Sequence, residues 1–497
     1  MDRTYTQIVV FALLLCCYAL TSAEVIDFTT GATDLGRHLK NGELLLSGSS
    51  GILRTNFYSY TQPDFEFINH HWLADVIFFL AWKAGDFEGL NAIYILLGGV
   101  AFGLFFRIAQ KAAGLPVAVA LAACLMPSLR ARPSVRPEIF TLLLSGVFLY
   151  ILWNHYQGRL SWRSLLILPV LEALWVNLHL GFILGPAFIG AFLLADLPRF
   201  KRWAPILLLT VAVTLLNPNG LRGATYPFTV WTNYGFDVIE NYSILRIEKT
   251  VYASYYRLME LTLAALFVSF IVAARRSKRF PLPTFALALL IGGMAWWAVR
   301  AEPLLALFSL SAIAINIGPV SVRWPVAMAA LGLVILAGLS YNGWRSLRKS
   351  APIGLGLKPG SNLAAELLRD SGLDGPILNN FNIGGYLIYY LFPQHRVFMD
   401  SRPEAYSAAF IREKYQMPFE NEDQWNQLLD EYKFNVICFA RATTAENRFI
   451  RRRVADPAWA PVFYDGGIVI LVRRTPSNSS FIQAHIIPQA LLPSMTQ

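Results

Sequence analysis

A cluster of ionisable side chains follows the first apolar stretch of the chain, in the segment "ATDLGRHLKNGE" at residues 32–43. The cluster holds Asp34, Arg37 and His38. A carboxylate can act as a general base on a hydroxyl group within hydrogen-bond reach, and a nearby histidine can carry protons or tune that base. These residue types make Asp34 and His38 candidate catalytic residues, with Arg37 as a candidate substrate-binding residue.

The same residues also suit structural roles. Aspartate is a favoured helix N-cap, so Asp34 would cap a helix that begins at Leu35 and would keep its capacity as a base. Arg37 and His38 would then lie on a solvated face of that helix. The segment alone leaves the catalytic and the structural interpretation open.

Three of the seven histidines of the chain lie between residues 24 and 88. Two of them, His70 and His71, are adjacent in "NHHW", and Arg54 lies upstream of them. Adjacent side chains point apart on a helix or a strand, which makes the two histidines a weak metal pair. All three residues are candidate substrate-binding residues, and the sequence neither requires nor excludes a divalent metal.

Further polar residues are expected at one end of several membrane-length segments. Arginine binds phosphate through its planar guanidinium group, and polar groups gathered at one membrane depth are more often functional than scattered ones. Snorkelling towards lipid headgroups and packing between helices are the structural alternatives. The candidate substrate-binding residues of this set are Arg132 and Arg136 in "RARPSVRPE", Asn177 and His179 in "WVNLHLGF", Arg222 in "NPNGLR" and Arg300 in "VRAEP".

The composition is that of an integral membrane protein. The 497 residues are 55% hydrophobic and 15% charged, whereas an average soluble chain has about 25% charged residues, and the mean hydropathy is +0.45. The net charge of +10 comes from short basic clusters between apolar runs, which are typical of topology signals and not of a nucleic-acid-binding face. The four cysteines show no disulfide or zinc spacing.

A helix needs roughly 20 apolar residues to cross a membrane. Segments near this length predict about eleven spans, at residues 7–23, 89–107, 114–129, 138–154, 164–180, 181–197, 204–217, 258–274, 283–299, 303–318 and 324–341. The short segment 72–85 is interpreted as an amphipathic helix in the interface, because counting it as a span would move the basic clusters outside. The first span has a second interpretation, as a cleaved signal peptide, which leaves the sidedness unchanged.

These spans predict a mostly α-helical, polytopic membrane bundle over residues 1–342, with a long first outer loop at 24–88. Residues 343–497 form a second predicted domain. Strand-like runs alternate there with segments of helical spacing, and the runs are "GPILNN", "HRVFMDSR", "NVICFAR" and "GIVILVRR". The alternation predicts a small α/β domain, and the charge pattern places it on the extracytoplasmic side with the first loop.

The first outer loop, "TDLGRHLKNGELL…ILRTNFYSYT…NHHWLADVIFF", resembles that of bacterial membrane glycosyltransferases of the GT-C superfamily, in the group related to the rhizobial lipid-A and core-sugar transferases. The runs "RPSVRPEIF", "LWVNLHLGFILG" and "LLNPNGLRGATYPF" resemble later markers of that group. The run "NNFNIGGYLIYYLFPQHRVFMDSRPEAY" resembles its outer domain. The matches follow one order along most of the chain.

The resemblance implies a multi-pass protein of the bacterial cytoplasmic membrane. It implies transfer of a sugar from a polyprenyl-phosphate carrier in the membrane lipid to a glycan, lipid or protein acceptor on the outer face. An acidic residue of the first loop would be the base, and Asp34 is at the matching position. Arg132 and Arg136 would hold the carrier phosphate, with Arg54 and Arg300 as further candidates.

The chain departs from the pattern of the group at two positions. Arg37 stands where an aromatic residue is common, and His71 stands where a glutamate is common, which leaves metal dependence undetermined. Two alternatives accompany the transferase hypothesis: a non-catalytic scaffold for surface-polymer assembly, and a flippase or transporter of lipid-linked sugars. Polar groups at the outer edge of the membrane region favour the transferase over a transporter, whose sites are usually near the midplane.

Overall fold

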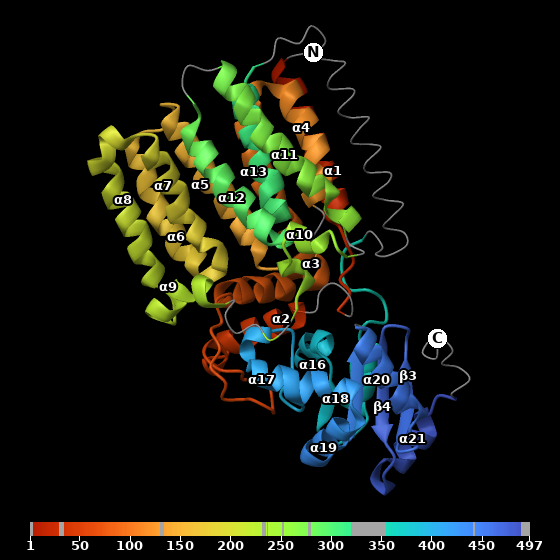
Figure 1. The fold of residues 1–497 in the computed structure, drawn as a ribbon. Coiled ribbons are helices and arrows are strands. Elements are labelled where there is room, and N and C mark those ends of the chain that lie inside the picture. Colours follow the sequence, from red (N-terminus) through yellow and green to blue (C-terminus); the bar gives the residue numbers. More distant parts are fainter. Residues whose placement is uncertain are drawn as a thin grey trace. The chain divides into compact units, whose positions relative to one another are not determined.

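The structure of the protein, a computed structural model, describes residues 3–28, 34–129, 134–230, 235, 237–250, 253–276, 280–319, 354–440 and 443–488. Contacts within the chain define two compact units, whose elements are labelled in Figure 1. The first unit comprises Met1–Val25, Leu90–Pro227 and Asp237–Leu355. The second comprises Ile26–Gly89, Phe228–Phe236 and Gly356–Gln497.

The long loop at residues 24–88 therefore groups with the C-terminal region, and not with the membrane-length helices that flank it in sequence. Backbone hydrogen bonds explain the grouping. Val397 N donates to Tyr58 O, and Tyr60 N donates to Val397 O. The predicted boundary at residue 342 divides the chain by sequence position. By contacts, residues 26–89 and 356–497, which lie on either side of that boundary, belong to one unit.

The described part of the first unit is helical. Its elements are α1 (Arg3–Ser22), the second part of α3 (Trp72–Ala113), α4 (Leu115–Leu129), α5 (Glu138–Tyr156), α6 (Ile167–Leu178), α7 (Leu184–Leu194), α8 (Phe200–Ala212), α9 (Gly220–Thr229), α10 (Ile244–Ile247), α11 (Ala253–Arg276), α12 (Leu282–Trp297) and α13 (Glu302–Ile317). Helices α6, α7 and α8 lie side by side in this unit (Figure 1).

Helix α13 forms the centre of the first unit. It packs against α4, α5, α11 and α12, and almost all of its side chains are buried. A helix that is apolar on every face is expected to be buried in this way. Two hydrogen bonds add polar contacts between helices: Ser311 Oγ donates to Phe105 O at 2.9 Å, and Asn316 Nδ2 donates to Ser269 Oγ at 2.7 Å.

Four helices of the described chain are long and apolar enough to cross a membrane: Trp72–Ala113, Glu138–Tyr156, Tyr256–Arg276 and Val299–Ile317. The pair Leu180–Leu194 and Leu197–Leu215 is bent by 111° and raises the number to five if it counts as one span. Large apolar side chains point outward from the bundle, with Leu208 and Leu261 exposing 68% and 66% of their surface, as lipid-facing residues would. The chain is a multi-pass membrane protein.

The predicted spans coincide with helices as far as residue 318. The last one, 324–341, lies outside the described residues. Several of these helices are shorter than a membrane crossing requires, so the number eleven stays a prediction.

Helix α3 contains a break between the predicted interfacial segment 72–85 and the predicted span 89–107. Gly85 (φ −157°, ψ 28°) and Asp86 (φ 53°, ψ −152°) depart from helical geometry. The predicted interfacial segment 72–85 therefore ends at the break, and the predicted span 89–107 follows it. The position of 72–85 at a membrane surface stays a prediction.

The second unit combines helices with one small sheet. Its helices are α2 (Leu35–Leu46), the first part of α3 at residues 72–84, α15 (Leu363–Asp370), α16 (Gly384–Leu391), α17 (Ala408–Phe410), the π-helix Ile411–Gln416, α18 (Met417–Glu420), α19 (Glu422–Tyr432), α20 (Thr444–Ala455) and α21 (Ser479–His485). Its strands are β1 (Ile377–Asn379), β2 (Val436–Ala440), β3 (Trp459–Tyr464) and β4 (Ile468–Arg473).

The sheet has the order β1-β2-β4-β3, with β1 and β2 parallel and the other pairs antiparallel. Strand β2 is buried along its whole length, which explains its continuous apolar sequence. Strand β3 lies at an edge of the sheet. A proline has no N–H to donate to a ladder, and an edge strand tolerates Pro461 because it needs donors towards only one neighbouring strand. The predicted helical chain with a small sheet is confirmed.

One predicted strand is wrong. The run "HRVFMDSR" at 395–402 forms only an isolated bridge between Val397 and Ser59. The run leaves extended pairing because Arg402 folds back onto Asp400 two residues earlier. Strand β3 was not predicted, since its sequence "WAPVFY" contains a proline.

A test of the fold uses Lys433, the residue that ends α19. Lys433 is exposed and adopts a left-handed conformation (φ 52°, ψ 48°), which costs a non-glycine residue about 1 kcal/mol. Lys433→Gly is expected to raise the free energy of unfolding by about 0.5–1 kcal/mol. The thermal midpoint of the purified protein in detergent should therefore rise. Lys433→Ala keeps the strained conformation and should not raise it. A lower midpoint for the glycine variant would contradict the assignment.

Candidate functional site

Asp34 occupies the N-cap position of α2, as the sequence suggested, but its side chain makes no cap hydrogen bond. It contacts two other side chains of the second unit. Arg37 Nη2 donates to Asp34 Oδ1 at 3.2 Å, and the Ser401 hydroxyl donates to the same oxygen. The side chain of Asp34 remains 24% exposed, whereas that of Arg37 is 5% exposed. The carboxylate is thus oriented by the protein and still reachable from solvent.

The remainder of α2 is held by a buried carboxylate, Asp75, near the start of α3. His38 Nδ1 lies 2.5 Å from Asp75 Oδ1, and Asn41 Nδ2 and Asn69 Nδ2 donate to Asp75 Oδ2 at 2.8 and 3.0 Å. The Tyr58 hydroxyl donates to Asn41 Oδ1 at 2.7 Å. Burial raises the pKa of Tyr58 well above its ordinary value, so this hydroxyl remains a donor at neutral pH.

Two glycines allow α2 to approach its neighbours closely. A Cβ atom on Gly42 would lie 2.3 Å from Asp75 O, and a Cβ atom on Gly36 would lie 2.3 Å from Gly385 O of α16. Neither position admits a larger side chain without backbone movement. Together with the Asp75 contacts, this packing fixes where the N-terminus of α2 places Asp34.

The segment 398–406 contributes a second buried charge pair. Arg402 donates to Asp400 through Nε at 2.7 Å and through Nη2 at 2.6 Å, and Nη2 also donates to Asn56 Oδ1 at 2.8 Å. Burial alone would lower the pKa of Arg402, but the paired carboxylate of Asp400 raises it, so the guanidinium stays charged. The guanidinium also lies 4.5 Å from the ring centre of Phe67.

Glu404 follows in the same segment. Its Oε2 atom is buried and has no hydrogen-bond partner within the described residues. Burial raises the pKa of Glu404, although the positive charges of Arg37 and Arg402 oppose the shift. The negative charge of Asp34 raises it further, which places a second carboxyl group in the electrostatic surroundings of Asp34.

The remaining candidates of the first loop lie near His38 or on the surface. The rings of His70 and His71 have centroids 3.7 Å apart, and the ring of His71 lies 5.7 Å from that of His38, edge to face. His70 Nδ1 lies 3.1 Å from Ile68 O. Arg54 is exposed. The two histidines therefore pack beside the Asp75 network.

Two candidate arginines of the first unit are paired with carboxylates. Arg136 Nη1 lies 3.2 Å from Glu240 Oε2, and Arg300 Nη2 lies 3.0 Å from Glu138 Oε1. Arg300 Nη1 also donates to Asn241 Oδ1 at 3.0 Å. These contacts bring together the start of α5, the turn before α10 and the turn before α13.

Three further candidates belong to the first unit, and one lies outside the described residues. His179 Nδ1 lies 2.7 Å from Thr141 Oγ1, and Asn177 Nδ2 donates to Leu216 O at 2.8 Å. Arg222 is exposed at the start of α9. Arg132 lies outside the described residues. Because Asp34 and these residues belong to different units, their expected proximity stays a prediction.

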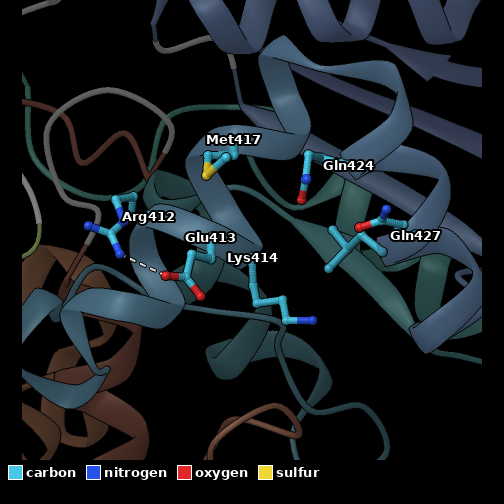
Figure 2. A pocket seen from close by; sticks show the side chains of 7 residues that line it. Arg412, Glu413, Lys414, Met417, Gln424 and Gln427 are labelled. Atoms are coloured by element: carbon cyan, nitrogen blue, oxygen red, sulfur yellow. Dashed lines mark hydrogen bonds and ion pairs between the residues drawn. The ribbon is translucent and has the colours of Figure 1, made fainter.

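No group of three or more His, Cys, Asp or Glu side chains in the described residues is arranged to hold a metal ion. A cavity of 520 Å³ lies elsewhere in the second unit, between the π-helix Ile411–Gln416 and α19. Figure 2 shows its lining, in which Arg412 pairs with Glu413 at 2.7 Å and Gln424 and Gln427 come from α19. None of the residues predicted from the sequence lines this cavity.

Comparison with solved structures identifies the fold. ArnT from Cupriavidus metallidurans bound to undecaprenyl phosphate is similar with a TM-score of 0.57 and 12% identity, over 96% of this chain and 99% of that chain. The Archaeoglobus fulgidus oligosaccharyltransferase tethered with an acceptor peptide is similar with a TM-score of 0.65 and 12% identity, over 95% and 74%. The arabinofuranosyltransferase AftD from Mycobacteria is similar with a TM-score of 0.53 and 16% identity, over 95% and 42%.

The chain has the GT-C fold. The predicted resemblance to GT-C membrane glycosyltransferases is therefore confirmed at the level of the fold. No family model matches the chain, and no curated protein matches its sequence.

Several residues around Asp34 in this GT-C fold were not predicted. Asp75 lies in the segment 72–85, which the sequence predicts to be an amphipathic helix, and a buried charge there requires partners. Ser401, Arg402 and Glu404 lie in "FMDSRPEAY", part of the run that resembles the outer domain of the GT-C group. The sequence contains no signal that relates this motif to Asp34, because the two are 367 positions apart.

A test of the Asp75 network uses Asp75→Asn. The amide would place N–H groups against the donors that now face a carboxylate, so we expect a loss of about 3 kcal/mol of unfolding free energy. The measurement is the thermal midpoint of the purified protein in detergent. Asp64→Asn, which changes an exposed carboxylate of the same loop, is the matched control and should leave the midpoint in place. Equal midpoints for both variants would refute the importance of the network.

Proposed function

We propose that the protein is a membrane glycosyltransferase that moves a sugar from a polyprenyl-phosphate donor to an acceptor on the outer face of the membrane. One observation carries the proposal. In a chain with the GT-C fold, the carboxylate of Asp34 is held by Arg37 and Ser401 on a rigid helix and remains partly exposed. A positioned, accessible carboxylate is the group that a hydroxyl acceptor needs.

In this proposal Asp34 accepts the proton of an acceptor hydroxyl. The acceptor oxygen forms a bond to the anomeric carbon of the sugar, and the bond from that carbon to the carrier phosphate breaks. The phosphate departs with the electron pair, and the configuration at the anomeric carbon inverts. The acceptor is a glycan, a lipid or a protein.

His38 acts in this proposal by positioning, although its residue type first suggested catalysis. Its side chain is 3% exposed, and Nδ1 faces the fully buried Asp75. An ionised Asp75 favours a proton on Nδ1, which holds the ring and therefore α2 in one orientation. Arg37 orients the Asp34 carboxylate through its guanidinium.

Negative charge develops on the departing phosphate, and arginines placed near it would stabilise the transition state. Arg136 and Arg300 are the proposed phosphate ligands within the described residues, with Arg132 as a further candidate. Their present partners are carboxylates at partly exposed positions, with side-chain exposures of 20–32%. Such ion pairs contribute about 0–1 kcal/mol, so exchange of a carboxylate for a phosphate costs little. Asn177, His179, Arg222, Arg54, His70 and His71 remain candidate substrate contacts.

A test of the catalytic role uses Asp34→Asn. Removing a general base is expected to lower the rate of sugar transfer by about 10²–10⁴-fold while the protein remains folded. The measurement is release of free polyprenyl phosphate by purified protein from a panel of synthetic polyprenyl-phosphate hexoses and pentoses, with a membrane glycolipid extract as acceptor. Glu43→Gln, on the same helix but paired with Lys40, is the control.

Full activity of Asp34→Asn would show that Asp34 is not the general base. An inactive wild type that nevertheless captures a surface-polymer assembly partner would favour the scaffold alternative. Movement of an intact lipid-linked sugar across vesicles without cleavage would favour a flippase.

A test of the proposed sidedness uses single cysteines. Ser477→Cys in the exposed turn before α21 is expected to react with a membrane-impermeant maleimide in spheroplasts, because 343–497 is proposed to lie outside. Arg159→Cys, in the exposed turn after α5, should react only after permeabilisation. The background is a variant in which the native cysteines are replaced by serine. The opposite labelling pattern would place the site on the cytoplasmic side.

A further inference from the structure

We infer that Ser401, from the C-terminal part of the chain, is a positioning residue that sets the orientation and basicity of Asp34. The inference rests on the proposed function only for its consequence for the rate. Its structural basis is the hydroxyl of Ser401, which donates to Asp34 Oδ1. Arg37 donates to the same oxygen, so two donors from different parts of the second unit converge on one carboxylate atom.

Ser401 has little freedom of its own, because the residues on either side of it are bound to each other. Asp400 and Arg402 form a doubly hydrogen-bonded pair, and the backbone N–H of Arg402 also donates to Asp400 Oδ1 at 3.1 Å. The backbone N–H of Asp400 donates to the Tyr406 hydroxyl at 3.0 Å. Ser401 therefore lies at the apex of a closed bend, and its Oγ is presented in a set direction.

The two glycines that begin α16 bring this bend and α2 against one common surface. A Cβ atom on Gly384 would lie 2.4 Å from Asp400 Cα, and the backbone of Gly385 contacts Gly36 of α2. The bend that carries Ser401 and the helix that follows Asp34 thus pack on adjacent residues of α16. This shared support explains how two residues far apart in sequence reach hydrogen-bond distance.

The charged groups described around Asp34 come from two segments. Arg37 comes from its own helix and Glu404 from the segment 398–406. Helix α16 contributes only tyrosines as titratable groups. A hydroxyl that donates to a carboxylate stabilises its ionised form, so loss of the Ser401 hydroxyl is expected to make Asp34 easier to protonate.

The test measures the titration of Asp34 directly and requires no substrate. The purified full-length protein in detergent is treated with a water-soluble carbodiimide and glycinamide across a pH series. Carbodiimides modify protonated carboxyl groups, and peptide mass spectrometry reports the fraction of Asp34 modified. In Ser401→Ala the pH midpoint of modification is expected to rise by about one unit.

Ser401→Thr retains the hydroxyl and should restore the wild-type midpoint, which a merely structural role for the serine side chain does not require. Ser407→Ala is the matched control, because Ser407 lies in the same region and its hydroxyl accepts from Phe410 N and from Gln62 Nε2. An unchanged midpoint in a folded Ser401→Ala protein overturns the inference. An equal shift in Ser407→Ala also overturns it.

The activity assay separates the two proposals. Ser401→Ala is expected to reduce kcat by roughly tenfold and to move the acid limb of the pH–rate profile upward with the labelling midpoint. If Asp34→Asn is fully active while Ser401→Ala shifts the labelling midpoint, the proposed function fails and the positioning role stands. If Asp34→Asn is inactive and Ser401→Ala matches the wild type in both assays, only the positioning role fails.

Discussion

The buried carboxylate of Asp75 is the contact on which the rest of the second unit depends. A carboxylate removed from water costs several kcal/mol unless hydrogen bonds replace its solvation. Asp75 has three side-chain donors, His38 and Asn41 from α2 and Asn69 from the loop before α3. These three contacts tie α2 and the preceding loop to the start of α3. The position of Asp34 follows from them.

A buried ion pair in the C-terminal region, between Asp400 and Arg402, likewise depends on hydrogen bonds for its stability. The pair of Asp400 and Arg402 is satisfied by its own hydrogen bonds and by Asn56 of the loop at residues 24–88. The loop and the C-terminal region therefore share hydrogen bonds and a cation–π contact, in which the Arg402 guanidinium lies over the ring of Phe67. Buried polar pairs contribute specificity here more than stability, since an apolar replacement of equal shape is often as stable.

The two units carry different chemistry. The described carboxyl groups around Asp34 belong to the second unit, whereas Arg136 and Arg300 belong to the first and are compensated by Glu240 and Glu138. Each part maintains its own charge balance in the absence of substrate.

The sequence by itself determined the membrane class, the helical segments and most strands of the small sheet, because these follow from local apolar periodicity and composition. It also identified Asp34 as the residue to examine. Only the tertiary structure decided that His38 is buried against Asp75, that the side chain of the N-cap residue Asp34 accepts from Ser401 instead of capping α2, and that "HRVFMDSR" bends instead of pairing as a strand. The reason is physical: a buried charge is stabilised by whichever donors the fold brings to it, and donors from distant segments leave no periodic trace in the sequence.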